Sequence, residues 1–144
     1  MLVSQILKSK ADEHVMTVPP QTTVAEAAAI LSSKRIGTLI VSRDGTKAEG
    51  ILSERDIVRE VGKRGGACLT ETVFTIMTHD PVTCTRSDTA DFVLHKMTDG
   101  RFRHLPVVEN GVMVGLISIG DVVKARLSEL AMEKTALEGM IMGN

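Results

Sequence analysis

Two nine-residue stretches decide the fold of this chain: GILSERDIV at residues 50–58 and GLISIGDVV at residues 115–123. Each has a glycine, two apolar residues and a serine, and an aspartate follows three places after the serine. A short apolar run with strand character leads into helical spacing, so each predicts a strand that turns directly into a helix. A near-copy 65 residues away indicates an internal repeat.

The repeat extends upstream of both stretches as a pair of predicted helices. Each helix shows the i, i+3, i+4, i+7 spacing of one apolar face, in the sets Val24, Ala27, Ala28, Leu31 and Ala90, Val93, Leu94, Met97. Thr23 and Thr89 precede them as predicted N-caps, and Glu26 completes a capping box in the first copy.

A predicted hairpin follows each helix. Strands are expected at 36–42 and 48–52 in the first copy, and at 102–108 and 113–117 in the second. The turn signals between them are Asp44-Gly45 and Asn110-Gly111. Each unit thus reads strand–helix–strand–strand–helix over about 45 residues, too few for an adequate core alone, so two copies must pack together.

The segments outside the repeat give weaker signals. A short helix is expected around Thr72–Met77 in the connection, and the tail from Asp121 to about Leu137 is predicted to be helical. Along the tail Leu127, Leu130, Leu137 and Ile141 continue an approximate 3–4 spacing from Val123, interrupted by Lys134. This stripe is interpreted either as partner-facing or as packed on its own domain, and the sequence leaves both open.

Composition narrows the class of protein. The 144 residues carry a formal net charge of −1, which gives no bulk attraction to nucleic acid or a membrane surface. There is no Trp, no Tyr and only three Phe, whereas single-strand binders usually stack bases on aromatic rings. The apolar runs are too short to span a membrane, and residues 1–10 lack the order of a secretory signal. We therefore expect a soluble cytoplasmic protein with two reduced thiols, Cys68 and Cys84, and no metal site.

The Ser-x-x-Asp pattern at each junction has two interpretations. In a capping box the serine accepts a hydrogen bond from a backbone N–H and the acid accepts one in return, with no ligand needed. In a binding site the unpaired N–H groups and partial positive charge of the helix start favour a phosphate. The serine then contacts phosphate, and the aspartate accepts from adjacent ribose hydroxyls. One occurrence favours the cap, but the duplication favours a nucleotide site.

Basic residues gather near the first junction and at the start of one second-copy strand. Arg55 and Arg59 follow Ser53, and Arg101-Phe102-Arg103-His104 open the strand. Guanidinium groups are natural partners of phosphate oxygens, although each arginine alone is typical of a solvated surface. His104 is interpreted as a phosphate contact, because no second group stands at the spacing of a nucleophile–base pair.

These residues resemble a tandem pair of cystathionine-β-synthase (CBS) domains, the stand-alone bacterial type of Bateman module. The first copy matches in VMTVPPQTTVAEA (15–27), IGTLIV (36–41) and GILSERDIV (50–58), and the second in IMTHDPVTC (76–84), RFRHLPVV (101–108) and GLISIGDVV (115–123). The resemblance implies an α/β (α+β) fold, with two β-α-β-β-α motifs packed about a pseudo-twofold axis. Residues 1–66 would hold the first motif, and residues 67–144 the second motif and the C-terminal helix.

The resemblance also implies two clefts between the motifs, each able to bind AMP, ADP, ATP, NAD or S-adenosylmethionine. The first cleft is expected to take residues from both motifs, namely Ser53, Arg55, Asp56, Thr78, Pro81, Val82, Arg101, Arg103, His104, Leu105 and Pro106. The second is expected to take Val15, Thr17, Ile36, Gly37, Thr38, Leu39, Ser118 and Asp121. The aspartates would hold ribose, the serines phosphate, and backbone near Val82 and Val15 would read adenine.

The two predicted clefts differ in charge. In the second, Gly120 stands where the first has Arg55, and Gly37 and Thr38 stand where the first has Arg103 and His104. We therefore expect the first cleft to prefer more phosphate charge and the second to be weaker or to take a less charged ligand.

The leading functional prediction is a non-enzymatic sensor in which an adenine nucleotide changes shape or assembly, for an unidentified regulated partner. The family implies a homodimer with the helices that begin at Glu54 and Ile119 at the interface. One alternative is a structural or protein-interaction module without significant nucleotide affinity, in which the junctions are only caps. Another is an enzyme whose site the sequence does not reveal.

Overall fold

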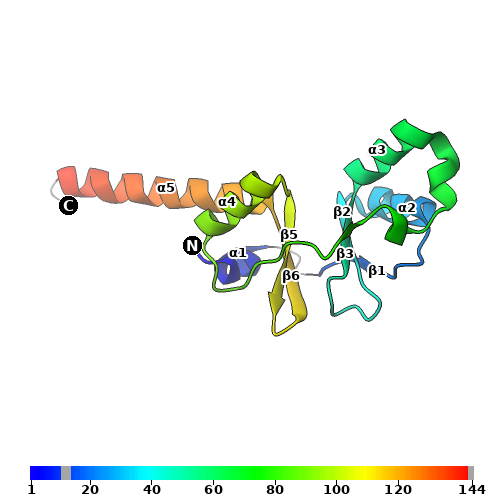
Figure 1. Cartoon of the computed structure of the whole chain (residues 1–144). Helices are drawn as coiled ribbons and strands as arrows, with labels where there is room; N and C mark the ends of the chain where they lie inside the picture. The colour runs from blue at the N-terminus through cyan, green and yellow to red at the C-terminus, as the bar shows by residue number, and fades with distance from the viewer. Residues whose placement is uncertain (11–13, 143–144) are drawn as a thin grey trace.

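The computed structural model describes residues 1–10 and 14–142 and contains two halves, each a small sheet covered by helices (Figure 1). The first half holds β1 (Thr17–Val18), α2 (Val24–Lys34), β2 (Thr38–Val41), β3 (Gly50–Ser53) and α3 (Glu54–Arg64). The second holds α4 (Ala90–Gly100), β5 (His104–Glu109), β6 (Val112–Ser118) and α5 (Ile119–Ile141). A short helix, α1 (Val3–Ser9), comes first, and the 3₁₀ helices η1 (Gly65–Thr70) and η2 (Val73–Thr75) and strand β4 (Thr78–His79) connect the halves.

The strand pairing follows the repeat. In the first sheet the order is β1-β2-β3-β4, with β1 parallel to β2 and the other pairs antiparallel. In the second sheet β5 and β6 form an antiparallel pair, and the strand that would match β1 is reduced to a parallel bridge between Cys84 and Val107. The mixed α+β class predicted from the sequence is confirmed.

Both copies pass from helix to hairpin in the same way. Thr23 and Thr89 accept backbone hydrogen bonds at the starts of α2 and α4, as predicted for N-caps. The same helices end at Arg35 and Arg101, which adopt left-handed φ values of 55° and 58° although neither is glycine. The Ile36 N–H then donates to the Leu31 carbonyl at 3.1 Å, which is the six-to-one bond of a Schellman motif and offsets the backbone strain.

Two hydrophobic cores form, and their membership crosses the expected 66/67 boundary. Val3 and Ile6 of α1 pack in the core of the second half, whereas Val73 and Met77 of the connection pack in the core of the first. Each half is too small to fill its own core, so each takes apolar side chains from outside its repeat. The short helix expected around Thr72–Met77 is the 3₁₀ helix η2, and α1 was not predicted.

The glycine that opens each repeated stretch has a packing role. A Cβ atom at Gly50 would collide with the side chain of Met77, and one at Gly115 would lie 2.9 Å from Cδ2 of Leu7. Both glycines therefore let an apolar side chain from outside their own repeat unit, Met77 or Leu7, lie flat on the sheet. Across the residues that the structure describes, no helix has the length and apolar content to cross a membrane.

Candidate functional site: two clefts between the halves

The first cleft, about 330 Å³ in volume, opens where α3 begins and where β5 of the other half begins. Its walls come from both halves and comprise Gly37, Thr38, Ile51, Ser53, Glu54, Arg55, Asp56, Arg59, Thr78, Pro81, Val82, Arg101, Phe102, Arg103, His104 and Leu105. A volume of this size lies at the lower end of the range for small-molecule sites.

Ser53 and Asp56 form a complete capping box at this cleft. The Asp56 N–H donates to Ser53 Oγ at 3.3 Å, and the Ser53 N–H donates to Asp56 Oδ2 at 2.8 Å. Arg59 holds the other carboxylate oxygen, Oδ1, at 2.8 Å. The capping box fixes the Asp56 carboxylate at the cleft wall, so a ligand in this cleft would meet the same two side chains that form the cap.

Four arginines line the first cleft: Arg55, Arg59, Arg101 and Arg103. Two come from the start of α3 and two from the segment before β5, so the cations approach from opposite halves. The acids that line the same cleft, Glu54 and Asp56, offset only half of that charge. The arrangement favours an anionic group with several oxygens, which guanidinium groups bind in pairs.

The second cleft, about 440 Å³, is lined by Lys10, His14, Val15, Met16, Lys34, Ile36, Gly37, Thr38, His104, Leu116 and Ser118. Its junction repeats the capping box, with the Ser118 N–H donating to Asp121 Oδ2 at 2.9 Å. Lys10, at the end of α1, donates to the same carboxylate oxygen at 2.9 Å and to the Leu116 carbonyl at 2.9 Å. Burial raises the pKa of Asp121, but the Ser118 and Lys10 hydrogen bonds outweigh it and the net pKa is lowered.

All but one of the residues predicted for the first cleft line it in the structure. The exception is Pro106, which pairs with Leu116 inside the second sheet and does not line the cleft. Arg59, Glu54 and Phe102 also line it, and the i+3 spacing from Asp56 was the signal for Arg59.

Fewer of the residues predicted for the second cleft line it. Thr17 pairs with Ile40 in the sheet, and Leu39 is wholly buried in the first core. Asp121 is hydrogen-bonded to Lys10, which lines the cleft, and is not itself among the lining residues. The five other predicted residues, Val15, Ile36, Gly37, Thr38 and Ser118, do line it.

The structure changes the expected difference in charge. Two lysines, Lys10 and Lys34, line the second cleft. Lys10 lies outside the repeat, and Lys34 ends the first repeated helix, where the second copy has Gly100, but the charges at this position were not compared. The two clefts therefore differ in the type of cationic side chain that lines them: guanidinium groups line the first cleft, and ammonium groups line the second.

His104 lines both clefts. Its Nδ1 lies 3.1 Å from the Thr38 hydroxyl, and this contact joins the two halves. Burial lowers the pKa of His104; Lys10 and Arg103 lower it further, against the opposing effect of Asp121. The lowered pKa favours the neutral form of the His104 imidazole.

Comparison with known proteins also finds CBS domains in both halves of the chain. The profile of the CBS domain matches residues 3–63 and 73–128. The mitochondrial CBS domain-containing protein CBSX3 of Arabidopsis thaliana is 32% identical over 98% of this chain and 72% of its own length. The chain spans only 24% of a longer relative from the same plant, CBSCBSPB3.

Solved structures resemble the whole fold. The CBS-domain protein ATU1752 of Agrobacterium tumefaciens is 43% identical, with a TM-score of 0.82, over 88% of this chain and 99% of that one. PAE2072 of Pyrobaculum aerophilum, solved in complex with AMP, is 31% identical over 92% of this chain and 99% of that one, with a TM-score of 0.78. The CBS domain pair of MJ0100, solved with 5-methylthioadenosine and S-adenosyl-L-methionine, is 25% identical over 90% of this chain and 98% of that one, with a TM-score of 0.77. With both halves matched by one profile and the fold shared along nearly the whole chain, this protein belongs to the CBS domain family as a tandem pair.

Proposed function

We propose that this protein is a regulatory module that binds an adenine nucleotide, AMP, ATP or NAD, in the clefts between its two CBS motifs. The observation that carries the proposal is the first cleft, where the start of α3 with Ser53 and Asp56 faces arginines from the other half. In this arrangement the phosphates lie among the guanidinium groups, and Asp56 accepts from the ribose hydroxyls. Ile51, Val82 and Leu105 supply the apolar part of the wall for adenine.

The regulatory part of the proposal follows from where the ligand would lie. A nucleotide between the halves contacts both, so it stabilises the arrangement that best matches it and shifts the balance of arrangements by its difference in affinity. No catalytic step is proposed, and we expect ATP and NAD to be recovered unchanged after incubation with the protein. A cytoplasmic location remains a prediction.

We further propose that the module forms a homodimer through α3 and the first turns of α5. Val58 and Val123 occupy the same position in the two copies and are 70% and 42% exposed. Valines at matching positions on two junction helices form a self-complementary apolar face, as a twofold interface requires.

Calorimetric titration of the purified protein with AMP, ADP, ATP, NAD and S-adenosylmethionine tests the proposal. Asp56→Asn keeps an oxygen for the cap but loses the charge that strengthens hydrogen bonds from ribose, so we expect a 10- to 100-fold weaker nucleotide affinity, equivalent to about 1.5–3 kcal/mol. Arg103→Gln should weaken ATP more than AMP, whereas the control Arg43→Gln, on an exposed loop 70% open to solvent, should change neither.

The alternative is a protein-interaction module in which the junctions are only helix caps. It predicts that Asp56→Asn lowers stability without changing any titration. Absence of both heat and thermal stabilisation with all five ligands at millimolar concentration would establish that alternative, since a ligand at 100 times its dissociation constant stabilises by about 2.7 kcal/mol.

A further inference from the structure

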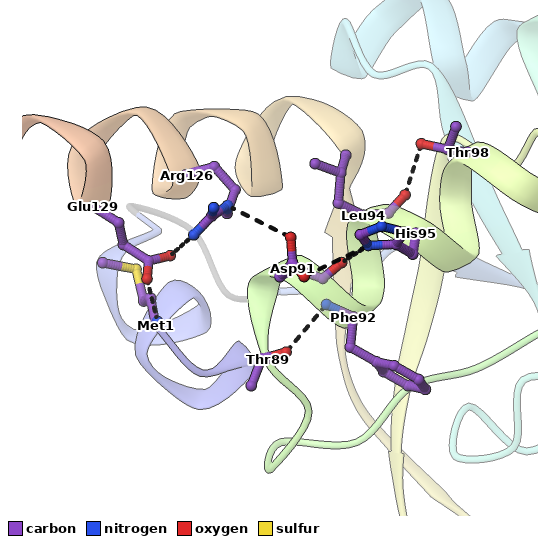
Figure 2. A network of polar contacts seen from close by, with 9 residues as sticks. All are labelled: Met1, Thr89, Asp91, Phe92, Leu94, His95, Thr98, Arg126 and Glu129. Carbon is purple, nitrogen blue, oxygen red and sulfur yellow. Dashed lines mark hydrogen bonds and ion pairs between the residues drawn. The ribbon is translucent and has the colours of Figure 1, made fainter.

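The first turns of α5 are fixed to the body of the protein. Val122 and Ala125 are buried in the second core. Figure 2 shows how the next turn is held: Arg126 lies 3.5 Å from Glu129 and 3.9 Å from Asp91 of α4, and the Met1 amino group lies 2.8 Å from Glu129. The direction of the helix is therefore set at its root.

Beyond Glu129 the helix leaves the body. Figure 1 shows this part of α5 extending away from both halves, and every residue from Leu130 to Met142 is exposed except the partly buried Gly139. A helical segment of about 12 residues is marginal in water by itself, and an internal glycine weakens it by about a further 1 kcal/mol. This part of α5 continues a helix formed at its root, and a covering partner would stabilise it.

The exposed apolar side chains follow a heptad pattern. Steps of four and three residues alternate along Val123, Leu127, Leu130, Lys134, Leu137 and Ile141, which we call the α5 seam. Its five apolar members are between 42% and 85% exposed, so the seam does not pack on its own domain. Such a spacing is that of coiled-coil core positions, and a single lysine in the core typically fixes the register of the pair.

The charges beside the seam select the orientation of the partner. Lys124 flanks its beginning, whereas Glu133 and Glu138 flank its end. A parallel copy would place Glu133 beside Glu138 of the partner helix, which repel each other. An antiparallel copy instead places Lys124 beside Glu138 of the partner helix at both ends of the pair. It brings only the two Glu133 side chains together at the centre, where Lys134 of each copy lies close to them and offsets their repulsion.

We propose that α5 pairs with α5 of a second copy as an antiparallel coiled coil along this seam. Leu127 of each copy then packs against Leu137 of the other, and Leu130 against Lys134. The contact uses no cleft residue and shares only Val123 with the dimer face of Val58 and Val123. It therefore goes further than the proposed function, and changes at Val58 or at Leu137 separate the two contacts.

Cysteine cross-linking tests the pairing and its direction. We expect Leu127→Cys and Leu137→Cys to form a disulfide-linked dimer when the two variants are mixed and oxidised, and little when each is oxidised alone. Cys68 and Cys84 are buried, and the unchanged protein controls for them. Linked dimers from each variant alone would show a parallel pair and overturn the proposal, as would no linked dimer in the mixture.

Light scattering on the full chain tests the surface without new thiols. Leu137→Glu should weaken self-association at least tenfold, whereas Met132→Glu, 64% exposed but off the seam, should leave it unchanged. Equal effects of the two variants would overturn the proposal.

Two further measurements separate the seam from the proposed function. Nucleotide titration of Leu137→Glu should match the unchanged protein, so a failure of nucleotide binding and a failure of the seam are told apart. Val58→Glu should disrupt the other dimer face and preserve the mixed disulfide; loss of that disulfide would overturn the seam as an independent contact.

Discussion

The Thr38 hydroxyl lies 3.1 Å from Nδ1 of His104, and these residues hold the same position in the two copies, 66 residues apart. A contact between equivalent residues is what a pseudo-twofold axis between the halves produces. Backbone bonds on either side repeat the symmetry, since the Glu54 N–H donates to the Gly37 carbonyl at 2.9 Å and the Ile119 N–H to the Arg103 carbonyl at 2.8 Å. Thr38 and His104 line both clefts, so the clefts share a wall.

Replacing Thr38 with valine should destabilise the fold. The Thr38 side chain is 6% exposed, and the change leaves Nδ1 of the half-buried His104 without this partner. We expect the free energy of unfolding in urea to fall by about 1–2 kcal/mol. Thr98→Val is the control, because its hydroxyl bonds to the Leu94 carbonyl on an exposed helix surface and should contribute less than about 0.5 kcal/mol. Equal losses would show that the contact between the halves adds nothing.

We expect two histidines, His104 and His95, to change the stability of the fold in opposite directions as the pH falls. Burial lowers the folded-state pKa of His104, with Lys10, Arg103 and Asp121 as the charges that face it, so acidification below about 6.5 protonates the unfolded chain first and destabilises the fold. The backbone carbonyl and carboxylate of Asp91 raise the pKa of His95, so the same acidification stabilises the fold through that side chain.

Unfolding of His104→Asn and His95→Asn at pH 7.5 and pH 5.5 checks these signs. Compared with the unchanged protein, His104→Asn should reduce the loss of stability on acidification, and His95→Asn should enlarge it. A shift in the same direction for both variants would contradict the assignment.

Local chemistry made much of the fold predictable. Thr23, Thr89 and the two Ser-x-x-Asp junctions act through hydrogen bonds to residues within one helical turn, so their partners stand beside them in the sequence. The repeat predicted the two similar halves, because two near-identical stretches of sequence indicate two similar structural units. Most residues that line the first cleft could be named because the repeated phrases carry the resemblance to CBS pairs, and that resemblance implies a cleft between the motifs.

The second cleft shows where that reasoning fails. Lys10 bonds to Asp121 across 111 residues, and it lies in a helix outside the repeat. This contact depends on Val3 and Ile6, which pack α1 onto the second core. No pattern in the neighbouring sequence indicates such long-range packing. Comparing charges at matching positions therefore could not reveal Lys10, whereas Lys34 ends a repeated helix and was open to that comparison.

Lys10→Met should raise the pKa of Asp121 toward its ordinary value. The Lys10 ammonium is one of the groups that lower this pKa in the folded state, so the carboxylate contributes stability above the unfolded-state pKa of about 3.9 that is lost as the pH falls through the folded-state value. NMR titration of the Asp121 carboxyl measures the pKa directly, and the stability difference between pH 6 and pH 3 should shrink in the variant. Lys34→Met is the matched control from the same cleft, and an equal change there would remove any special role of Lys10.

Two glycine-to-alanine changes in neighbouring elements should have opposite signs. Gly50 in β3 faces the buried side chain of Met77, and an added methyl group must displace it, so we expect a loss of about 1–3 kcal/mol in urea unfolding. Gly62 in α3 has no atom within 4 Å of a Cβ placed on it, so alanine there gains helix propensity, up to about 1 kcal/mol, without a clash. If Gly50→Ala were as stable as the parent protein, the Met77 side chain would have to change its conformation without any loss in the free energy of unfolding. The repeated glycine would then reflect the backbone of β3 rather than the packing of the connection between the halves.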